Sequence, residues 1–332
     1  MLGFFRTLVL FVFATVIVVM PKDGNGQSAA KSSETVAGEA QRAAALAESG
    51  HCKEALPLLK KAIRQVVDKD FKKRLALDGL HCAMTHDSYE ALDFLVVLSR
   101  DFPHDPEVLY AATHAYSDLS MRASQDLAHE APFSFQVHEL NAEALEIQGK
   151  WDQAAVEYRK ILEISPMLPG IHARLGRALL SKSQASPAEI EQARKNFQEE
   201  LEINPQNQVA EFVLGQLAAD AKDNATAIQH FTRATKIDSG FMEAYLGLGT
   251  ALNSAKQFTE AIPPLETYEK MAPDSPTGHY QLAVAYAGAG RREDSNREAA
   301  LQRQSSEALE SVKRKAATAM ESQSGSQAPE QK

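Results

Sequence analysis

The sequence predicts an all-α fold, an α-solenoid of about eight helix-turn-helix repeats that ends in a C-terminal capping helix. From about Glu39 onward the apolar residues follow a helical spacing, and no alternating run is long enough for a sheet. A Gly or Ala also recurs in a similar apolar setting, at separations of 34, 39, 34 and 34 residues, at Ala142, Gly176, Gly215, Gly249 and Ala283. A period of about 34 residues is typical of stacked helix pairs, which bury their apolar faces only against neighbouring repeats.

The composition fits a folded protein that does not bind nucleic acid. The 332 residues are 44% hydrophobic and 24% charged, which excludes a wholly disordered chain. The formal net charge is −9, and Lys and Arg are interspersed with Asp and Glu. Because this pattern gives no basic stripe, we expect no contact with a phosphate backbone.

Residues 1–26 are predicted to be a signal peptide. Arg6 precedes the uncharged apolar run Leu8–Met20. A run of about 13 residues is shorter than the roughly 20 that a membrane-spanning helix needs. Cleavage is expected before Gln27. The alternative is an uncleaved anchor, through which alone the protein would contact a membrane. Both cases predict export to the periplasm, the cell envelope or the secreted space.

The repeats are expected between terminal segments of different composition. Residues 27–38 are small and polar and predict a linker, and residues 39–304 predict the repeat array. Residues 305–320 keep a helical spacing of apolar residues, so we expect a capping helix that shields the last repeat. Residues 321–332 are mainly Ser, Gln, Gly and Pro and predict a disordered tail.

The most specific pattern lies between Gly149 and Pro166. Gly149 supplies a turn, Ala154 is small where two helices cross, and Tyr158 and Ile161 share one helix face. Pro166 ends the second helix, because proline cannot continue a helix interior. This pattern resembles the tetratricopeptide-repeat (TPR) family, and the resemblance implies a right-handed superhelix. The same slots recur as Ala55, Leu59 and Ala62, as Ala91, Leu95 and Leu98, as Ala193, Phe197 and Pro205, as Ala227, Phe231 and Ala234, and as Ala261, Leu265 and Pro273.

Two stretches depart from the regular period. Ser181–Pro187 inserts between the two helices of the fifth repeat, which is therefore 39 residues long. Between Pro106 and Pro132 the pattern is degenerate. We expect two helices there, one around Leu109–Tyr116 and the other around Met121–Glu130.

No motif for catalysis, for a cofactor or for a metal ion is recognisable. The pairs His51-Cys52 and His81-Cys82 are adjacent residues, whose side chains point about 100° apart on a helix and do not chelate easily. Other histidines, including His279, are expected at surface-like helix positions. We therefore expect no catalytic residue, no cofactor and no metal site.

The two cysteines allow two interpretations. Cys52 begins the second helix of the first repeat, and Cys82 lies late in the first helix of the next. The TPR resemblance implies that these helices are antiparallel neighbours, which would bring the two sulfurs together. An oxidising compartment would then join them in a disulfide. The alternative is a pair of small buried apolar residues.

The resemblance also implies a concave groove lined by the first helix of each repeat. Three residues before the recurring Gly or Ala, an apolar ladder is expected from Phe212, Leu246 and Tyr280. Polar and basic residues beside the ladder complete the expected groove: Arg174, Arg177, Gln216 and Asn253. Acidic residues precede them: Glu139, Glu143 and Glu146. The alternative is that the ladder residues only pack within the superhelix.

The expected function is a non-catalytic scaffold that binds a partner protein or peptide in this groove. Two alternatives stay open. One is an assembly or maturation factor of the cell envelope that holds a client transiently, and the other is an enzyme with an unrecognised site. A closed pocket with clustered titratable groups would favour the enzyme, whereas an open groove would favour the other two.

Overall fold

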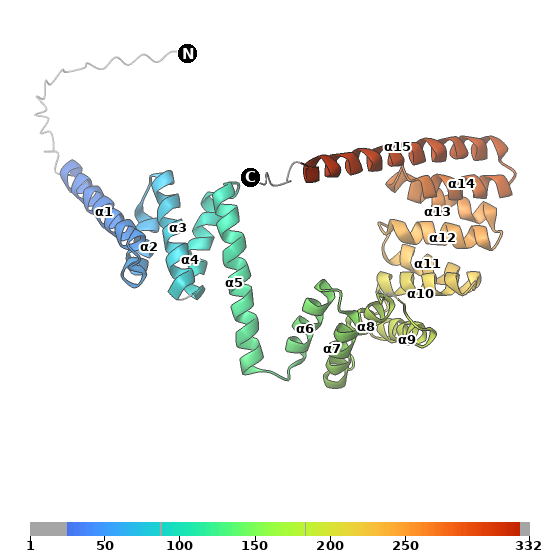
Figure 1. The fold of residues 1–332 in the computed structure, drawn as a ribbon, viewed down its shortest axis with the longest axis horizontal. Coiled ribbons are helices and arrows are strands. Elements are labelled where there is room, and N and C mark those ends of the chain that lie inside the picture. Colours follow the sequence, from blue (N-terminus) through green and yellow to red (C-terminus); the bar gives the residue numbers. More distant parts are fainter. Residues whose placement is uncertain (1–24, 87, 183, 326–332) are drawn as a thin grey trace, which may run out of the picture. The chain divides into compact units, whose positions relative to one another are not determined.

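The computed structural model describes residues 25–86, 88–182 and 184–325. Over these residues the chain forms fifteen α-helices, one short 3₁₀ helix and no strand, which confirms the expected all-α class. The chain divides into two compact units, Met1–Leu127 and Ala128–Lys332 (Figure 1). Among the described helices, none is both long enough and apolar enough to cross a membrane.

The first unit contains two helix pairs and one long helix. Consecutive helices pack on one another, α1 on α2, α2 on α3 and α3 on α4. The elements are α1 (Asn25–Glu48), α2 (Cys52–Gln65), α3 (Lys69–His86), η1 (Ser88–Glu90), α4 (Ala91–Asp101) and α5 (Pro106–Glu130), whose end passes the division between the units.

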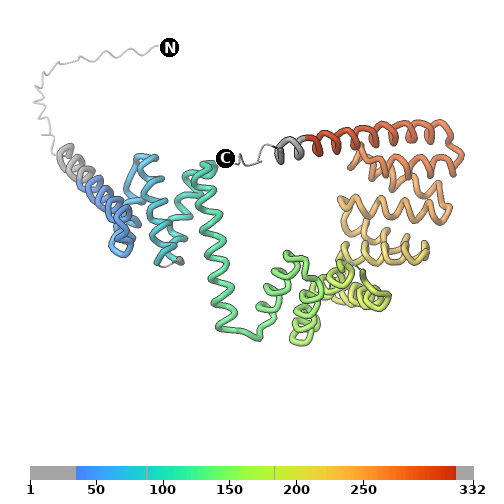
Figure 2. Tube along the Cα trace, in the orientation of Figure 1, coloured from blue at the N-terminus to red at the C-terminus, as the bar shows by residue number. Residues whose placement is uncertain are grey.

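The second unit contains five helix pairs in chain order. Each helix packs on the next, within a pair and between pairs, and Figure 2 shows the main chain passing from one helix to its neighbour through short turns. The helices are α6 (Phe135–Ile147), α7 (Trp151–Ile164), α8 (Ile171–Leu180), α9 (Pro187–Ile203), α10 (Gln208–Asp220), α11 (Asn224–Ile237), α12 (Met242–Ser254), α13 (Phe258–Met271), α14 (Pro276–Gly288) and α15 (Arg292–Gly325).

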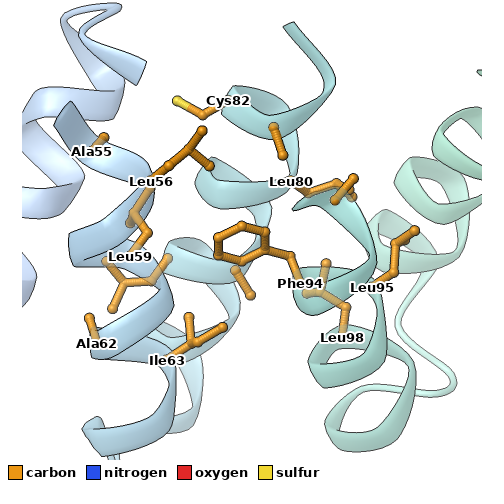
Figure 3. Close-up of a cluster of buried hydrophobic side chains, with 14 of the residues drawn as sticks. Ala55, Leu56, Leu59, Ala62, Ile63, Leu80, Cys82, Phe94, Leu95 and Leu98 are labelled. Carbon is orange, nitrogen blue, oxygen red and sulfur yellow. The ribbon is translucent and has the colours of Figure 1, made fainter. Parts of the chain in front are cut away.

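The recurring slots of the sequence form the core of both units. In the first unit the ring of Phe94 points toward Leu59 and Ile63 across the interface of the helix pairs (Figure 3). The small and large slot residues of the later repeats are all between 0% and 3% exposed: Ala154, Tyr158, Ile161, Ala193, Phe197, Ala227, Phe231, Ala234, Ala261 and Leu265. Apolar burial therefore repeats along the stack with the period of the sequence.

The turn inside most pairs needs one residue with left-handed backbone. Gly50, Gly149 and Gly290 have φ values of 79°, 68° and 79°. At the same turn Lys222 and Lys256 adopt φ values of 64° and 61°. A side chain makes this conformation costly, so the two lysine turns are held by the packing of the helices on either side.

The degenerate stretch differs from the expectation. In place of two helices around Leu109–Tyr116 and Met121–Glu130, the structure has the single helix α5. Residues 117–120, Ser-Asp-Leu-Ser, include no Gly or Pro that would end a helix, so the helix continues. The third helix pair of the predicted array is therefore replaced by one long helix.

The terminal boundaries also differ. The helix α1 begins at Asn25, so residues 27–38, expected as a linker, are helical. Their composition of mainly Ala, Ser, Lys and Glu permits this. Residues 1–24 of the expected signal peptide lie outside the described residues.

The expected capping helix 305–320 is the second half of α15, which begins at Arg292 and ends at Gly325 without a break. No Gly or Pro interrupts residues 292–324. The first half of α15 packs on α14, whereas Leu309 and Val312 are 47% and 62% exposed. The last repeat is thus covered by the first half of the helix. Of the expected tail, residues 321–325 are helical and residues 326–332 lie outside the described part.

Candidate interaction groove

A solvent-open hollow lies on the second unit, with a volume of about 1110 Å³. Helices α8, α9, α10 and α12 contribute to its wall. Its apolar lining includes Leu180, Ile190, Phe212 and Leu246, and its polar lining includes Gln216 and Thr250. An apolar surface with a few polar groups is the usual composition of a binding site for an apolar anchor side chain.

The repeat geometry brings these residues together. Phe212 and Gln216 are four residues apart on α10, so they share a helix face, and Leu246 and Thr250 take the same positions on α12. The start of α10 is fixed by Asn207, whose side chain accepts a hydrogen bond from the backbone N–H of Ala210. Equivalent faces of adjacent repeats therefore form one wall.

Phe212 has a structural role as well as a place in the wall. Its ring centroid lies 5.7 Å from that of Phe231 and 4.9 Å from that of Phe241, both in tilted arrangements. These contacts hold the ring in one orientation while part of it lines the hollow. Both interpretations of the ladder residue, groove lining and internal packing, therefore apply to Phe212.

Tyr280 lies elsewhere. It is 55% exposed and lines a smaller hollow of about 290 Å³ between α14 and α15, with Ala283 and Val284. The ladder expected from three residues is thus two residues long in the larger hollow, and its third member belongs to the last repeat.

Asn253 is not available to a ligand. Its side chain is 8% exposed, and its Nδ2 donates to the backbone oxygen and to the Oε1 of Gln281, both at 3.0 Å. It joins α12 to α14. Its position on α12 predicted that Asn253 would line the groove, but its side chain points toward the neighbouring repeat.

The expected basic residues are paired with the expected acidic ones. Nitrogen atoms of Arg174 and Arg177 lie 2.6 Å and 2.7 Å from carboxylate oxygens of Glu143 and Glu146. Burial acts to lower the pKa of Arg174, but the hydrogen bond to Glu143 and other favourable interactions outweigh it, so the pKa lies above its ordinary value. These pairs tie α6 to α8 and leave this part of the surface close to neutral.

Tyr158 is buried beside the ion pairs of Arg174 and Glu146. Burial, followed by the negative charge of Glu146, raises the pKa of Tyr158 to about 12. The phenol is therefore neutral throughout the physiological range and acts as a core group.

Sequence reasoning missed the contribution of the insertion. Ala185 and Ile190 line the hollow from the segment between α8 and α9 and from the start of α9. Ser186 caps α9 with a reciprocal capping box to Glu189, which fixes that segment. The spacing of 39 residues revealed the insertion, but not that its end faces the groove.

Cys52 and Cys82 form a disulfide in the structure. Their Cα atoms are 5.0 Å apart, and the residues are 5% and 0% exposed. The bond joins the first turn of α2 to the last third of α3. Neither sulfur is then a thiolate, so the His-Cys pairs of the sequence offer no thiolate ligand to a metal.

Comparisons with known proteins agree with this architecture. Residues 174–240 match the model of the tetratricopeptide repeat. No curated protein matches the chain.

Solved structures that are similar to part of the chain include the MamA protein, at 18% identity and a TM-score of 0.47, covering 52% of this chain and 92% of that chain. YrrB, described as a TPR protein with an unusual peptide-binding site, is 18% identical with a TM-score of 0.49 and covers 55% of this chain and 92% of that one. MamA from Desulfovibrio magneticus RS-1 is 14% identical with a TM-score of 0.47 and covers 52% of this chain and 96% of that chain. The repeat match at residues 174–240, together with the stacked helix pairs and their buried recurring residues, shows that the chain contains tetratricopeptide repeats.

Proposed function

We propose that this protein is a non-catalytic scaffold that binds a segment of a partner protein in the hollow of the second unit. The observation that carries the proposal is the combination of apolar and polar groups there. Phe212 and Leu246 would contact an apolar side chain of the partner. Gln216 and Thr250 would exchange hydrogen bonds with its polar groups.

The chemistry of the hollow supports binding rather than catalysis. The ionisable residues of its lining are Asp220, Lys222 and Glu243, and all three are exposed. Water screens exposed charges, whereas the acids and bases of catalytic sites are typically buried or closely paired with other charges. An open hollow of this kind suits a stable scaffold and equally an assembly factor that releases its client.

We also place the protein outside the cytoplasm, in the periplasm, the cell envelope or the secreted space. The charged and apolar N-terminus and the pairing of Cys52 with Cys82 support this proposal, because disulfides persist in oxidising compartments. Fractionation of cells that produce the protein, with cytoplasmic and exported marker proteins, tests it. Recovery of the protein with the cytoplasmic marker would contradict it.

Immobilised protein and extracts of the source organism test the groove. Gln216→Arg adds a bulky charge at an exposed position of the hollow, so it should block an apolar partner segment without disturbing the fold. Tyr280→Ala is the matched control, because it removes an exposed aromatic outside the hollow.

A partner that binds the parent protein and Tyr280→Ala, and binds Gln216→Arg at least about tenfold more weakly, supports the proposal. Circular dichroism should show unchanged helicity in both variants. Equal binding to all three proteins would move the binding surface away from the hollow. Specific turnover of a small molecule by the parent protein would favour an enzyme instead.

A further inference from the structure

Three chemically active side chains meet at the end of the second unit. Glu269 on α13, His279 on α14 and Glu298 on α15 come from three successive helices. One ligand atom of each lies within 4.8 Å of the others. The side chains of His279 and Glu298 are 3% and 4% exposed, whereas that of Glu269 is 31% exposed and opens the cluster to solvent. The sequence placed His279 at a surface-like position, and the structure corrects this.

The imidazole of His279 is oriented by the backbone. Its Nε2 lies 2.9 Å from the carbonyl oxygen of Pro273, which can only accept, so Nε2 carries a hydrogen. Its Nδ1 then faces oxygens of Glu298 at 2.8 Å and of Glu269 at 3.6 Å. Three electron-pair donors therefore converge on one point. A proton or a metal cation between them relieves their mutual repulsion.

The charges around the cluster favour a cation. Arg297 approaches Glu298 at 3.4 Å, but its side chain is 59% exposed and solvent weakens its charge. Glu266 is another charged neighbour of Glu269; it accepts a hydrogen bond from Tyr286 and adds negative charge. One proton would leave two carboxylates incompletely neutralised, whereas a divalent cation balances both.

Histidine–glutamate pairs also join the two helices of other repeats, where no third ligand lies beside them in the described part of the chain. His138 on α6 pairs with Glu157 on α7 at 2.6 Å, across the same 19 residues of sequence as His279 and Glu298. In the pair of Glu211 on α10 with His230 on α11, also at 2.6 Å and 19 residues apart, the two residue types are exchanged. In both of these pairs a cation from the same helix pair, Lys160 or Arg233, also contacts the carboxylate, as Arg297 contacts Glu298. What distinguishes the cluster at His279 is the second carboxylate, Glu269.

Among the described residues, the junction of α13, α14 and α15 holds the one group of three such ligands. The position equivalent to Glu269 in the preceding repeat, 34 residues earlier, is Thr235.

We propose that Glu269, His279 and Glu298 bind one divalent transition-metal cation, for which zinc is the best match. One imidazole nitrogen and two carboxylate oxygens are zinc ligands, and ligands about 2.0–2.2 Å from a tetrahedral zinc lie roughly 3.3–3.6 Å apart. The separations of His279 Nδ1 from the two carboxylates, 2.8 Å and 3.6 Å, lie close to this range, and the two carboxylate oxygens lie within 4.8 Å of each other. The Pro273 carbonyl is the outer partner that orients a metal-ligating histidine. Bound metal would fasten the last three helices together.

Calorimetric titration of the tag-free, full-length protein with zinc chloride tests the site. The parent protein should bind one zinc ion per chain at a site of higher affinity than any other. Glu269→Gln removes one ligand at a partly exposed position and should weaken this binding by more than about tenfold. His138→Gln is the matched control, because it breaks the equivalent pair in another repeat and should leave zinc binding unchanged.

Hydrogen exchange gives a second measurement. Saturating zinc should slow amide exchange in α14 and the first half of α15 of the parent protein, and should not do so in Glu269→Gln. Cobalt(II) should give visible absorption bands in the parent protein that the variant loses. Only weak binding at several sites, or equal affinity in the parent protein and Glu269→Gln, would overturn the proposal and identify the cluster as an imidazolium ion pair.

Discussion

Single residues set how closely the helices of this protein approach. Gly249 on α12 lies against Leu265 of α13, and a Cβ atom placed on it would meet Leu265 Cγ at 2.3 Å. Gly176 faces the ring of Phe197 in the same way, at 2.7 Å. Each large residue of a second helix thus fills the space that a glycine of the first helix leaves open. Close packing of this kind leaves no room for an added methyl group.

Gly249→Ala should therefore destabilise the second unit. Leu265 is 0% exposed, so it cannot move away into solvent. We expect an overpacking cost of about 1–3 kcal/mol, which exceeds the gain of roughly 1 kcal/mol from replacing a glycine within a helix. Urea unfolding followed by circular dichroism measures the difference.

Gly38→Ala is the control, since a Cβ at Gly38 meets nothing within 4 Å. It should raise stability slightly through helix propensity alone. A neutral or stabilising Gly249→Ala would show that the helices of this repeat separate at little cost.

At the scale of single residues, the sequence predicted correctly that the recurring apolar side chains are buried, because helical spacing alone determines this. The small and large slot residues, such as Ala227 and Phe231, are buried as their spacing predicted. The prediction failed for Asn253 and Tyr280. Their positions on the helix were sound, but the direction of a side chain depends on the neighbouring repeat, to which Gln281 and α15 belong. No helical period contains that information.

Helix termini decide how the elements are arranged around the groove. The insertion runs into the start of α9, which Ser186 caps, and the Glu189 carboxylate accepts a hydrogen bond from the Ser186 backbone N–H. Lys182 contacts Glu189 at 2.6 Å from within the insertion. The cap therefore fixes both the start of α9 and the segment that carries Ala185 into the hollow.

This cap should depend on pH. The hydrogen bond from Lys182, followed by that from the Ser186 backbone, lowers the pKa of Glu189 to about 2. Because the folded-state pKa is depressed, the cap stabilises the fold fully above the ordinary pKa of about 4.5 and is lost as the pH falls toward 2. Carbon-13 NMR titration of the Glu189 carboxyl should give a midpoint well below 4.5.

Comparison of the parent protein with Glu189→Gln separates this effect from the other carboxylates. The stability difference between the two proteins should shrink as the pH is lowered from about 5 to 2. A difference that does not change with pH, or an NMR midpoint near 4.5, would contradict the role of the ion pair.

Element boundaries were the least predictable feature of the sequence. Where Gly or Pro marks a turn, as at Gly149 and Pro166, the predicted and observed boundaries agree. At the expected breaks within α5 and α15 such residues are absent, and the helix continues. A degenerate repeat retains helix propensity after it has lost its turn, so periodicity alone cannot distinguish one helix from two.

At the scale of the whole molecule, each helix depends mainly on its neighbours in the chain. The period of 34 residues predicted this nearest-neighbour stack. The division after Leu127 was not predicted, because it follows from the replacement of one helix pair by α5. In such an array the effect of a local change should fade over one or two repeats rather than spread through a common core.

Removal of the disulfide tests whether the effect of a local change stays within one unit. The bond closes a segment with a sequence separation of 30 between α2 and α3, which should stabilise the first unit by about 3 kcal/mol. Replacing both Cys52 and Cys82 by Ala should therefore increase amide exchange in α2 and α3. Exchange in α10 to α14 should not change, because those helices lie in the other unit. Dithiothreitol should reproduce the effect in the parent protein and have none on the double variant. Faster exchange in both units would show that the two unfold together and that stability is shared along the whole chain.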